Sequence, residues 1–98
     1  MLTRIVKMTF HPELTPDFLK IFHESAPQIR ASEGCLYLEL FQEPLHPYTY
    51  FTCSRWTGED SLNAYRNSPL FASTWAKTKI LFAEKAEAWS LESVALFK

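Results

Sequence analysis

The sequence has few of the features that mark several protein classes. Its longest apolar runs are about four residues, whereas a membrane-spanning helix needs about 20. Ten basic and eleven acidic residues give a net charge of -1 and form no basic stripe, so neither a nucleic acid nor a membrane is an expected partner. The N-terminal segment alternates like a strand and lacks a signal-peptide pattern, so we expect a cytoplasmic protein.

Cysteine is also scarce. The two cysteines, Cys35 and Cys53, lie in apolar, strand-like segments without the CxxC spacing of redox and zinc sites. The simplest interpretation is two buried thiols that behave as small apolar side chains. The sequence therefore predicts neither a disulfide framework nor a metal site.

What the sequence does contain is a high share of apolar and aromatic side chains. Of 98 residues, 47% are hydrophobic and 15% are aromatic. A chain of this length can build one hydrophobic core and has no room for a second. We therefore expect a single domain over residues 1–98.

Apolar periodicity and turn residues predict an alternation of strands and helices. The first element is a strand at 3–10. A helix capped by Thr15 follows, which Pro27 should kink and Gly34 should end. The remaining elements are strands at 35–43 and 48–57 around a proline-bounded loop, helical segments at 58–67 and 68–82, and a strand with an apolar tail at 86–97. The order is β-α-β-β-α-β, with the second helix in two pieces. It predicts a ferredoxin-like α+β fold with an antiparallel sheet.

The central hairpin carries most of the candidate site residues. If residues 44–47 form its loop, paired positions sum to 91, which places Glu39 opposite Thr52 and on one face with Tyr37 and Trp56. The other face of the hairpin is apolar as well. Because a sheet that is apolar on both faces must be covered on both, we expect helices over one face and a partner subunit over the other.

The order, length and spacing of these elements resemble the antibiotic biosynthesis monooxygenase family. The local signals are "EGC" opening the second strand, "RW" ending the third and "NSPLF" joining the two helical pieces. The resemblance covers nearly the whole chain. It implies a dimeric α+β barrel, in which two sheets pack face to face and each subunit keeps a pocket between sheet and helices. It also implies oxygenation of quinols, anthrones or similar activated aromatics with no metal or flavin cofactor.

The resemblance carries over only part of the family's site. In the polyketide-oxidising members, an asparagine and a tryptophan on the third strand hold the substrate. The tryptophan falls on Trp56, but the asparagine falls on Thr52. The family's helical tyrosine falls near Leu62 and its arginine near Ala76. In the haem-degrading branch, the asparagine, tryptophan and histidine fall on Thr3, Tyr65 and Trp75. No histidine stands at the iron-ligating position, so haem oxygenation is not expected.

The candidate site therefore consists of aromatic side chains and one carboxylate. We assign substrate stacking to Trp56 and Trp75, hydrogen bonding to Thr52 and Tyr65, and proton acceptance to Glu39. Phe71 and Tyr37 complete the predicted substrate-binding residues. For each aromatic residue the alternative is ordinary core packing, and for the carboxylate it is an ion pair on a solvated strand.

Two functions are compatible with these patterns. The first is cofactor-independent monooxygenation of a quinol- or anthrone-like small molecule by a homodimer. The alternative is a non-catalytic dimeric domain, small-molecule-binding or stress-associated, with a vestigial pocket. An ionisable group inside a dry cavity favours the enzyme, whereas a purely structural module would have no cavity.

Overall fold

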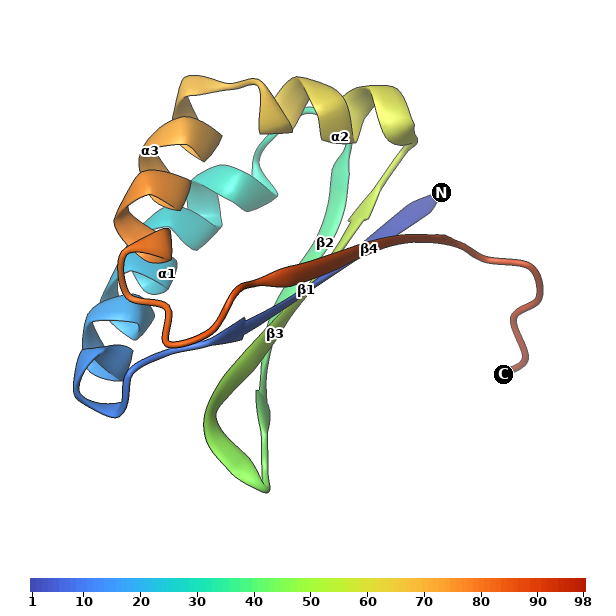
Figure 1. The fold of residues 1–98 in the computed structure, drawn as a ribbon. Coiled ribbons are helices and arrows are strands. Elements are labelled where there is room, and N and C mark those ends of the chain that lie inside the picture. Colours follow the sequence, from blue (N-terminus) through green and yellow to red (C-terminus); the bar gives the residue numbers. More distant parts are fainter.

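The computed structural model describes all 98 residues and contains one four-stranded sheet with helices packed on one of its faces (Figure 1). Its elements are β1 (Leu2–Thr9), the short 3-10 helix η1 (Pro12–Leu14), α1 (Thr15–Arg30), β2 (Cys35–Glu43), β3 (His46–Trp56), α2 (Glu59–Arg66), α3 (Pro69–Lys79) and β4 (Glu87–Glu92). The strand order is β2-β3-β1-β4, with every neighbouring pair antiparallel. The predicted ferredoxin-like α+β fold is confirmed. None of the helices is both long enough and apolar enough to span a bilayer.

The helix ends follow local signals in the sequence, with one difference. Ser68 caps α3, because its Oγ accepts a hydrogen bond from the Phe71 N–H at 3.2 Å. Thr15 is not a cap but the first residue of α1, and its hydroxyl donates to the His11 carbonyl at 3.1 Å. The helix then continues past Pro27 without a break.

The hairpin register predicted from the sequence is wrong by one residue over most of its length. Glu39 pairs with Cys53, and Thr52 pairs with Leu40. The cause is a register shift at each end of β2, which a loop-length argument could not reveal. Because opposed residues share a face and successive residues alternate, Tyr37 and Glu39 lie on the opposite face from Thr52.

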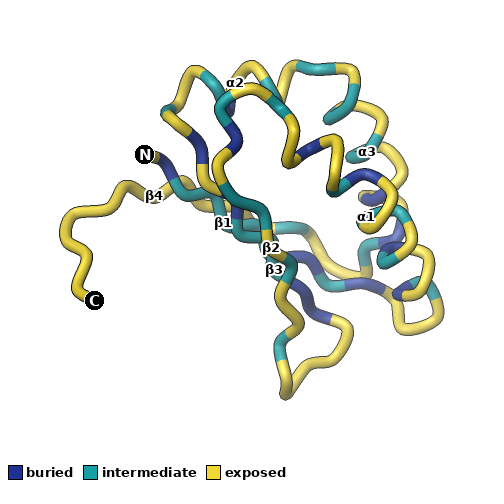
Figure 2. Tube along the Cα trace, turned by 180° about the vertical axis from the view of Figure 1, so that it is seen from behind, coloured by how far each residue is buried: buried dark blue, intermediate teal, exposed yellow.

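The core lies between the sheet and the helices, where buried residues gather along the inner side of the chain trace (Figure 2). One cluster surrounds Phe10, whose ring stacks on that of Phe18 at a centroid distance of 4.0 Å. A second cluster contains Trp56 with Leu2, Cys35 and Leu62. These clusters hold the sheet at a fixed position beneath α1 and α2.

The other face of the sheet has no helix over it (Figures 1 and 2). We call it the open face; by strand register its apolar residues are Ile5, Phe41, Phe51, Cys53, Trp89 and Leu91. Phe41, Trp89 and Leu91 are large side chains with 45%, 43% and 52% of their surface exposed. The open face is therefore uncovered within one chain and carries exposed apolar side chains, alongside charged ones such as Glu39 and Arg55.

Candidate functional site

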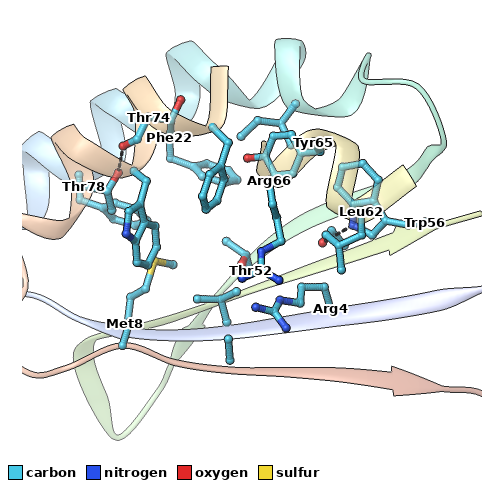
Figure 3. A pocket seen from close by; sticks show the side chains of 18 residues that line it. Arg4, Met8, Phe22, Thr52, Trp56, Leu62, Tyr65, Arg66, Thr74 and Thr78 are labelled. Carbon is cyan, nitrogen blue, oxygen red and sulfur yellow. Dashed lines mark hydrogen bonds between the residues drawn. The ribbon is translucent and has the colours of Figure 1, made fainter. Parts of the chain in front are cut away.

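A cavity of about 360 Å³ lies between the sheet and the three α helices. Its volume is in the range of small-molecule sites, and 12 of the 18 residues that line it are hydrophobic. The sheet contributes one side of the cavity, and α1, α2 and α3 contribute the other (Figure 3).

Strand alternation decides which sheet residues reach the cavity. In β1, Arg4, Val6 and Met8 point to the helix side, and the register places Arg4 beside Ser54 and Val6 beside Thr52 of β3. On the other flank of β1, β4 contributes only the small side chain of Ala88. Space above the middle of the sheet is therefore left unfilled.

Aromatic side chains form a continuous series along the cavity. Trp56 stacks on Tyr65 with centroids 5.1 Å apart and planes at 23°. Tyr65 meets the Phe71 ring edge-on at 5.3 Å, and Phe71 is nearly parallel to Trp75 at 5.9 Å. Phe82 continues the series beyond Trp75. The series offers a flat ligand several aromatic surfaces in one place.

The two ends of this series differ in burial. Trp56 is only 1% exposed, and its Nε1 donates to Ser54 Oγ at 2.9 Å. Phe71 and Trp75 are partly exposed. Trp56 is therefore a core residue that also borders the cavity, whereas Phe71 and Trp75 have ring surface left for a ligand.

Hydroxyl groups supply the neutral polar atoms of the cavity. The Thr78 hydroxyl is already used, since it donates to the Thr74 carbonyl at 2.7 Å, whereas the hydroxyl of Thr52 borders the cavity from the sheet side (Figure 3). Burial, with a smaller contribution from nearby Cys35, raises the pKa of Tyr65 to about 12. At neutral pH Tyr65 is therefore protonated and available as a hydrogen-bond donor, not as a base.

The charged groups of the cavity are two arginines from opposite sides. Arg4 comes from the sheet and Arg66 from α2, and their guanidinium groups are directed toward the same region (Figure 3). Burial, and next the positive charge of Arg66, lower the pKa of Arg4. Arg4 Nη1 donates to Ser90 Oγ at 2.9 Å, and neither arginine forms an ion pair. No carboxylate and no histidine lines the cavity.

With this geometry in place, comparison with known proteins decides the family. The model of the antibiotic biosynthesis monooxygenase family matches residues 1–77. The chain belongs to this family. No curated protein matches the sequence.

Solved structures agree with the family's fold. A crystal structure of an antibiotic biosynthesis monooxygenase superposes with a TM-score of 0.91 at 18% identity, covering 97% of this chain and 100% of the other. The protein Rv0793 from Mycobacterium tuberculosis superposes with a TM-score of 0.90 at 15% identity, covering 99% of this chain and 98% of the other. A conserved protein from Methanosarcina mazei Go1 superposes with a TM-score of 0.87 at 21% identity, covering 93% of this chain and 91% of the other. At these identities the likeness concerns the fold.

In this monooxygenase-family protein the structure brings most of the predicted site residues together. Five of them line the cavity: Thr52, Trp56, Tyr65, Phe71 and Trp75. Their part in binding a substrate stays a prediction.

Tyr37 and Glu39 do not reach the cavity. The shifted register turns both toward the open face, where the Arg55 guanidinium lies 4.8 Å from the centre of the Tyr37 ring. Glu39 is exposed there. The predicted face shared by Glu39 and Thr52 is therefore wrong, and with it the geometric reason for assigning Glu39 as proton acceptor.

Sequence reasoning missed the two arginines. For Arg4 a signal is available, because alternation along a strand at 3–10 puts Arg4 and Met8 on one face. Arg66 gave no such signal, since the last turn of a helix often carries a basic residue for electrostatic reasons alone. Only the tertiary fold brings the two side chains together.

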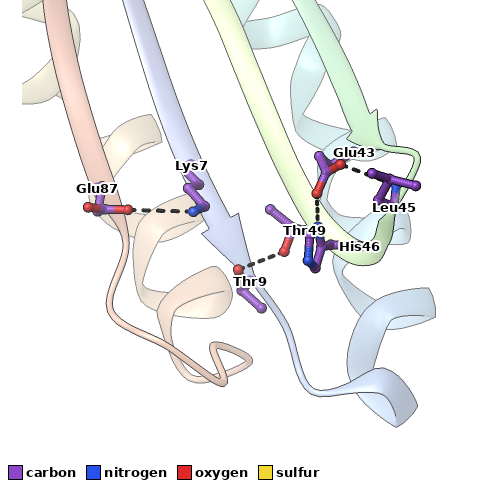
Figure 4. Close-up of polar contacts among 7 residues, drawn as sticks. All are labelled: Lys7, Thr9, Glu43, Leu45, His46, Thr49 and Glu87. Carbon is purple, nitrogen blue, oxygen red and sulfur yellow. Dashed lines mark hydrogen bonds and ion pairs between the residues drawn. The ribbon is translucent and has the colours of Figure 1, made fainter.

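A further group of polar contacts in this family member lies away from the cavity, near the hairpin end of the sheet (Figure 4). His46 is hydrogen-bonded to Glu43, which holds the pKa of that exposed carboxyl below its usual value. Thr9 and Thr49 hydroxyls are 2.9 Å apart, and Lys7 lies 3.8 Å from Glu87. The structure has no group of three or more His, Cys, Asp or Glu side chains placed to hold a metal ion.

Proposed function

We propose that this protein is a monooxygenase that oxidises a flat, quinol- or anthrone-like aromatic molecule without a cofactor. The observation that carries the proposal is the cavity of about 360 Å³ bordered by a continuous series of aromatic rings. Membership in the antibiotic biosynthesis monooxygenase family supports it.

The chemistry of such a substrate needs no external reductant. An anthrone-type methylene group loses a proton to water, since no carboxylate or histidine lines the cavity, and the carbanion reduces dioxygen and adds to it to give a peroxide. The peroxide takes up a proton and eliminates water, leaving a ketone. One oxygen atom stays in the product and the other leaves as water, so the substrate supplies all the electrons. The protein has to orient the ring, exclude bulk water and stabilise the anion.

The residues of the cavity divide these tasks. Phe71 and Trp75 pack against the substrate ring, while Trp56 fixes the position of Tyr65. Thr52 and the protonated Tyr65 hydrogen-bond to substrate oxygens. None of these residues is assigned as proton acceptor, because no carboxylate and no histidine lines the cavity.

A homodimer is part of the proposal. The open face is uncovered and exposes large apolar side chains, and a second copy of the same face would bury them on both subunits. A single domain over residues 1–98 is supported by the pairing of β4 with β1, which ties the last strand to the first. The cytoplasmic location remains a prediction from the sequence.

Oxygen uptake tests the proposed function. The purified, metal-stripped protein is offered a panel of quinols and anthrones in an oxygen electrode, with products identified by mass spectrometry. We expect uptake with incorporation of one labelled oxygen atom per product, and its loss in Trp75→Ala. Ile80→Ala, a truncation of a residue at the end of α3 that is 73% exposed, should keep the activity. A folded protein that binds these compounds but consumes no oxygen would refute the monooxygenase and leave a binding protein.

A further inference from the structure

The cavity is electrostatically unbalanced. Its only residues charged at neutral pH are Arg4 and Arg66, and no acidic side chain lines it. Arg4 is partly buried beside apolar surface, whereas Arg66 is exposed where it borders the cavity, so Arg4 is the less hydrated of the two charges. Burial lowers the pKa of Arg4, and the positive charge of Arg66 lowers it further, so the two arginines are close enough to repel each other.

Neither arginine is held by an ion pair within the chain. Arg4 uses one guanidinium nitrogen for the neutral Ser90 hydroxyl. Arg66 also borders a second hollow of about 280 Å³ together with Glu59 and Glu92, but it forms an ion pair with neither. Both guanidinium groups therefore keep donors available for a ligand.

The two charges of the cavity gather in one part of it. Figure 3 shows the Arg4 and Arg66 guanidinium groups near Thr52, with Met8 lying well to one side of them. The aromatic series connects the two ends, since Tyr65 precedes Arg66 on α2 and Trp75 lies on α3. A ligand that matches this layout has a flat apolar body and an anionic group at one end.

We propose that Arg4 and Arg66 together bind the carboxylate of an aromatic acid, whose ring lies along the aromatic series. A carboxylate fits because two guanidinium forks can each donate to its oxygens, and the negative charge removes the repulsion between them. This inference rests on the proposed function in taking the cavity as the substrate site. It narrows the substrate to quinol- or anthrone-like molecules that carry an acid group.

Binding of two matched probes tests this assignment without any oxidation. 2-Naphthoate carries the carboxylate, and 2-naphthamide has nearly the same shape without the charge; isothermal titration measures both under nitrogen. We expect the parent protein to bind naphthoate at least about tenfold more tightly than naphthamide, as for charge-assisted hydrogen bonds in a partly dry site. Raising the salt concentration should weaken only the naphthoate complex.

Substitutions then assign the preference to the two side chains. Arg4→Gln and Arg66→Gln should each remove most of the preference and leave naphthamide affinity nearly unchanged. Arg4→Lys keeps the charge and should retain part of it. Lys20→Gln removes one positive charge from an exposed position on α1 outside the cavity, and it should behave as the parent. Circular dichroism confirms that each variant is folded.

The outcomes separate this inference from the function on which it rests. Equal affinity for both probes, or a preference that survives in both Arg→Gln variants, would overturn the carboxylate site while the aromatic cavity stands. If neither probe binds, both proposals fail. Selective naphthoate binding by a protein that never consumes oxygen would support the anion site and refute the monooxygenase.

Discussion

Replacing Trp56 with alanine should damage the fold before it affects ligand binding. The side chain is 1% exposed, its ring stacks on Tyr65 at 5.1 Å, and its Nε1 donates to Ser54 Oγ at 2.9 Å. Truncating a buried tryptophan costs about 3–5 kcal/mol, out of a total of about 5–15 kcal/mol for a small domain. For a chain of this size that corresponds to a melting temperature lowered by roughly 20 °C.

Trp75→Ala is the matched comparison. Trp75 is partly exposed at the cavity and keeps one nearly parallel neighbour, Phe71 at 5.9 Å, so its truncation should cost only about 1–2 kcal/mol. It should nevertheless abolish binding of flat ligands. Urea unfolding followed by far-UV circular dichroism measures both variants without depending on tryptophan emission. If Trp56→Ala is as stable as the parent and Trp75→Ala is the unstable variant, the assignment of core and ligand surfaces is reversed.

Three further perturbations test other parts of the structure. Trp89→Asp places a charge on the open face and should convert a dimer to a monomer in analytical ultracentrifugation. Ile80→Asp, at the exposed end of α3, should leave the dimer unchanged. A parent protein that is itself monomeric would contradict the proposed dimer. The folded-state pKa of Tyr65 is about 12, above the unfolded value near 10, so the unfolded state loses this proton first and stability falls as the pH rises between these two values. Tyr65→Phe should therefore lose less unfolding free energy than the parent between about pH 9 and pH 11. An equal loss in both proteins would refute the shift. Gly34→Ala should lower the unfolding free energy by more than about 1 kcal/mol, because the φ angle of Gly34 is +82° and the added Cβ would lie 2.4 Å from Ser61 Cβ. A neutral effect in denaturant unfolding would show that Gly34 and Ser61 lie farther apart than described.

Local signals in the sequence were sufficient for the elements and their order. Ser68 followed by Pro69 is a local signal for the start of a helix, and the Ser68 cap of α3 is observed. Alternation of apolar residues marks β1, and it is enough to put Arg4 and Met8 on one face. Such signals depend on residues a few positions apart, and this is why they survive without tertiary information.

The site was harder to predict because it depends on register and on distant residues. One extra residue near the start of β2, at Leu36, and a second irregularity before the turn shift the pairing, and Glu39 changes faces as a result. The four aromatic residues Trp56, Tyr65, Phe71 and Trp75 were found without the register, since helix positions and the strand end are insensitive to it.

The cavity itself argues against a purely structural module. An empty apolar void of about 360 Å³ would cost about 9 kcal/mol, comparable with the whole stability of a small domain. Arg4, Arg66 and Thr52 make one end polar, so water can enter there and the cost is much smaller. A ligand that forms stronger hydrogen bonds to these groups would displace that water. An aromatic acid would fill the apolar end with its ring and replace the water at the arginines with its carboxylate, which explains in one step why the space is unfilled and why its charge is one-sided.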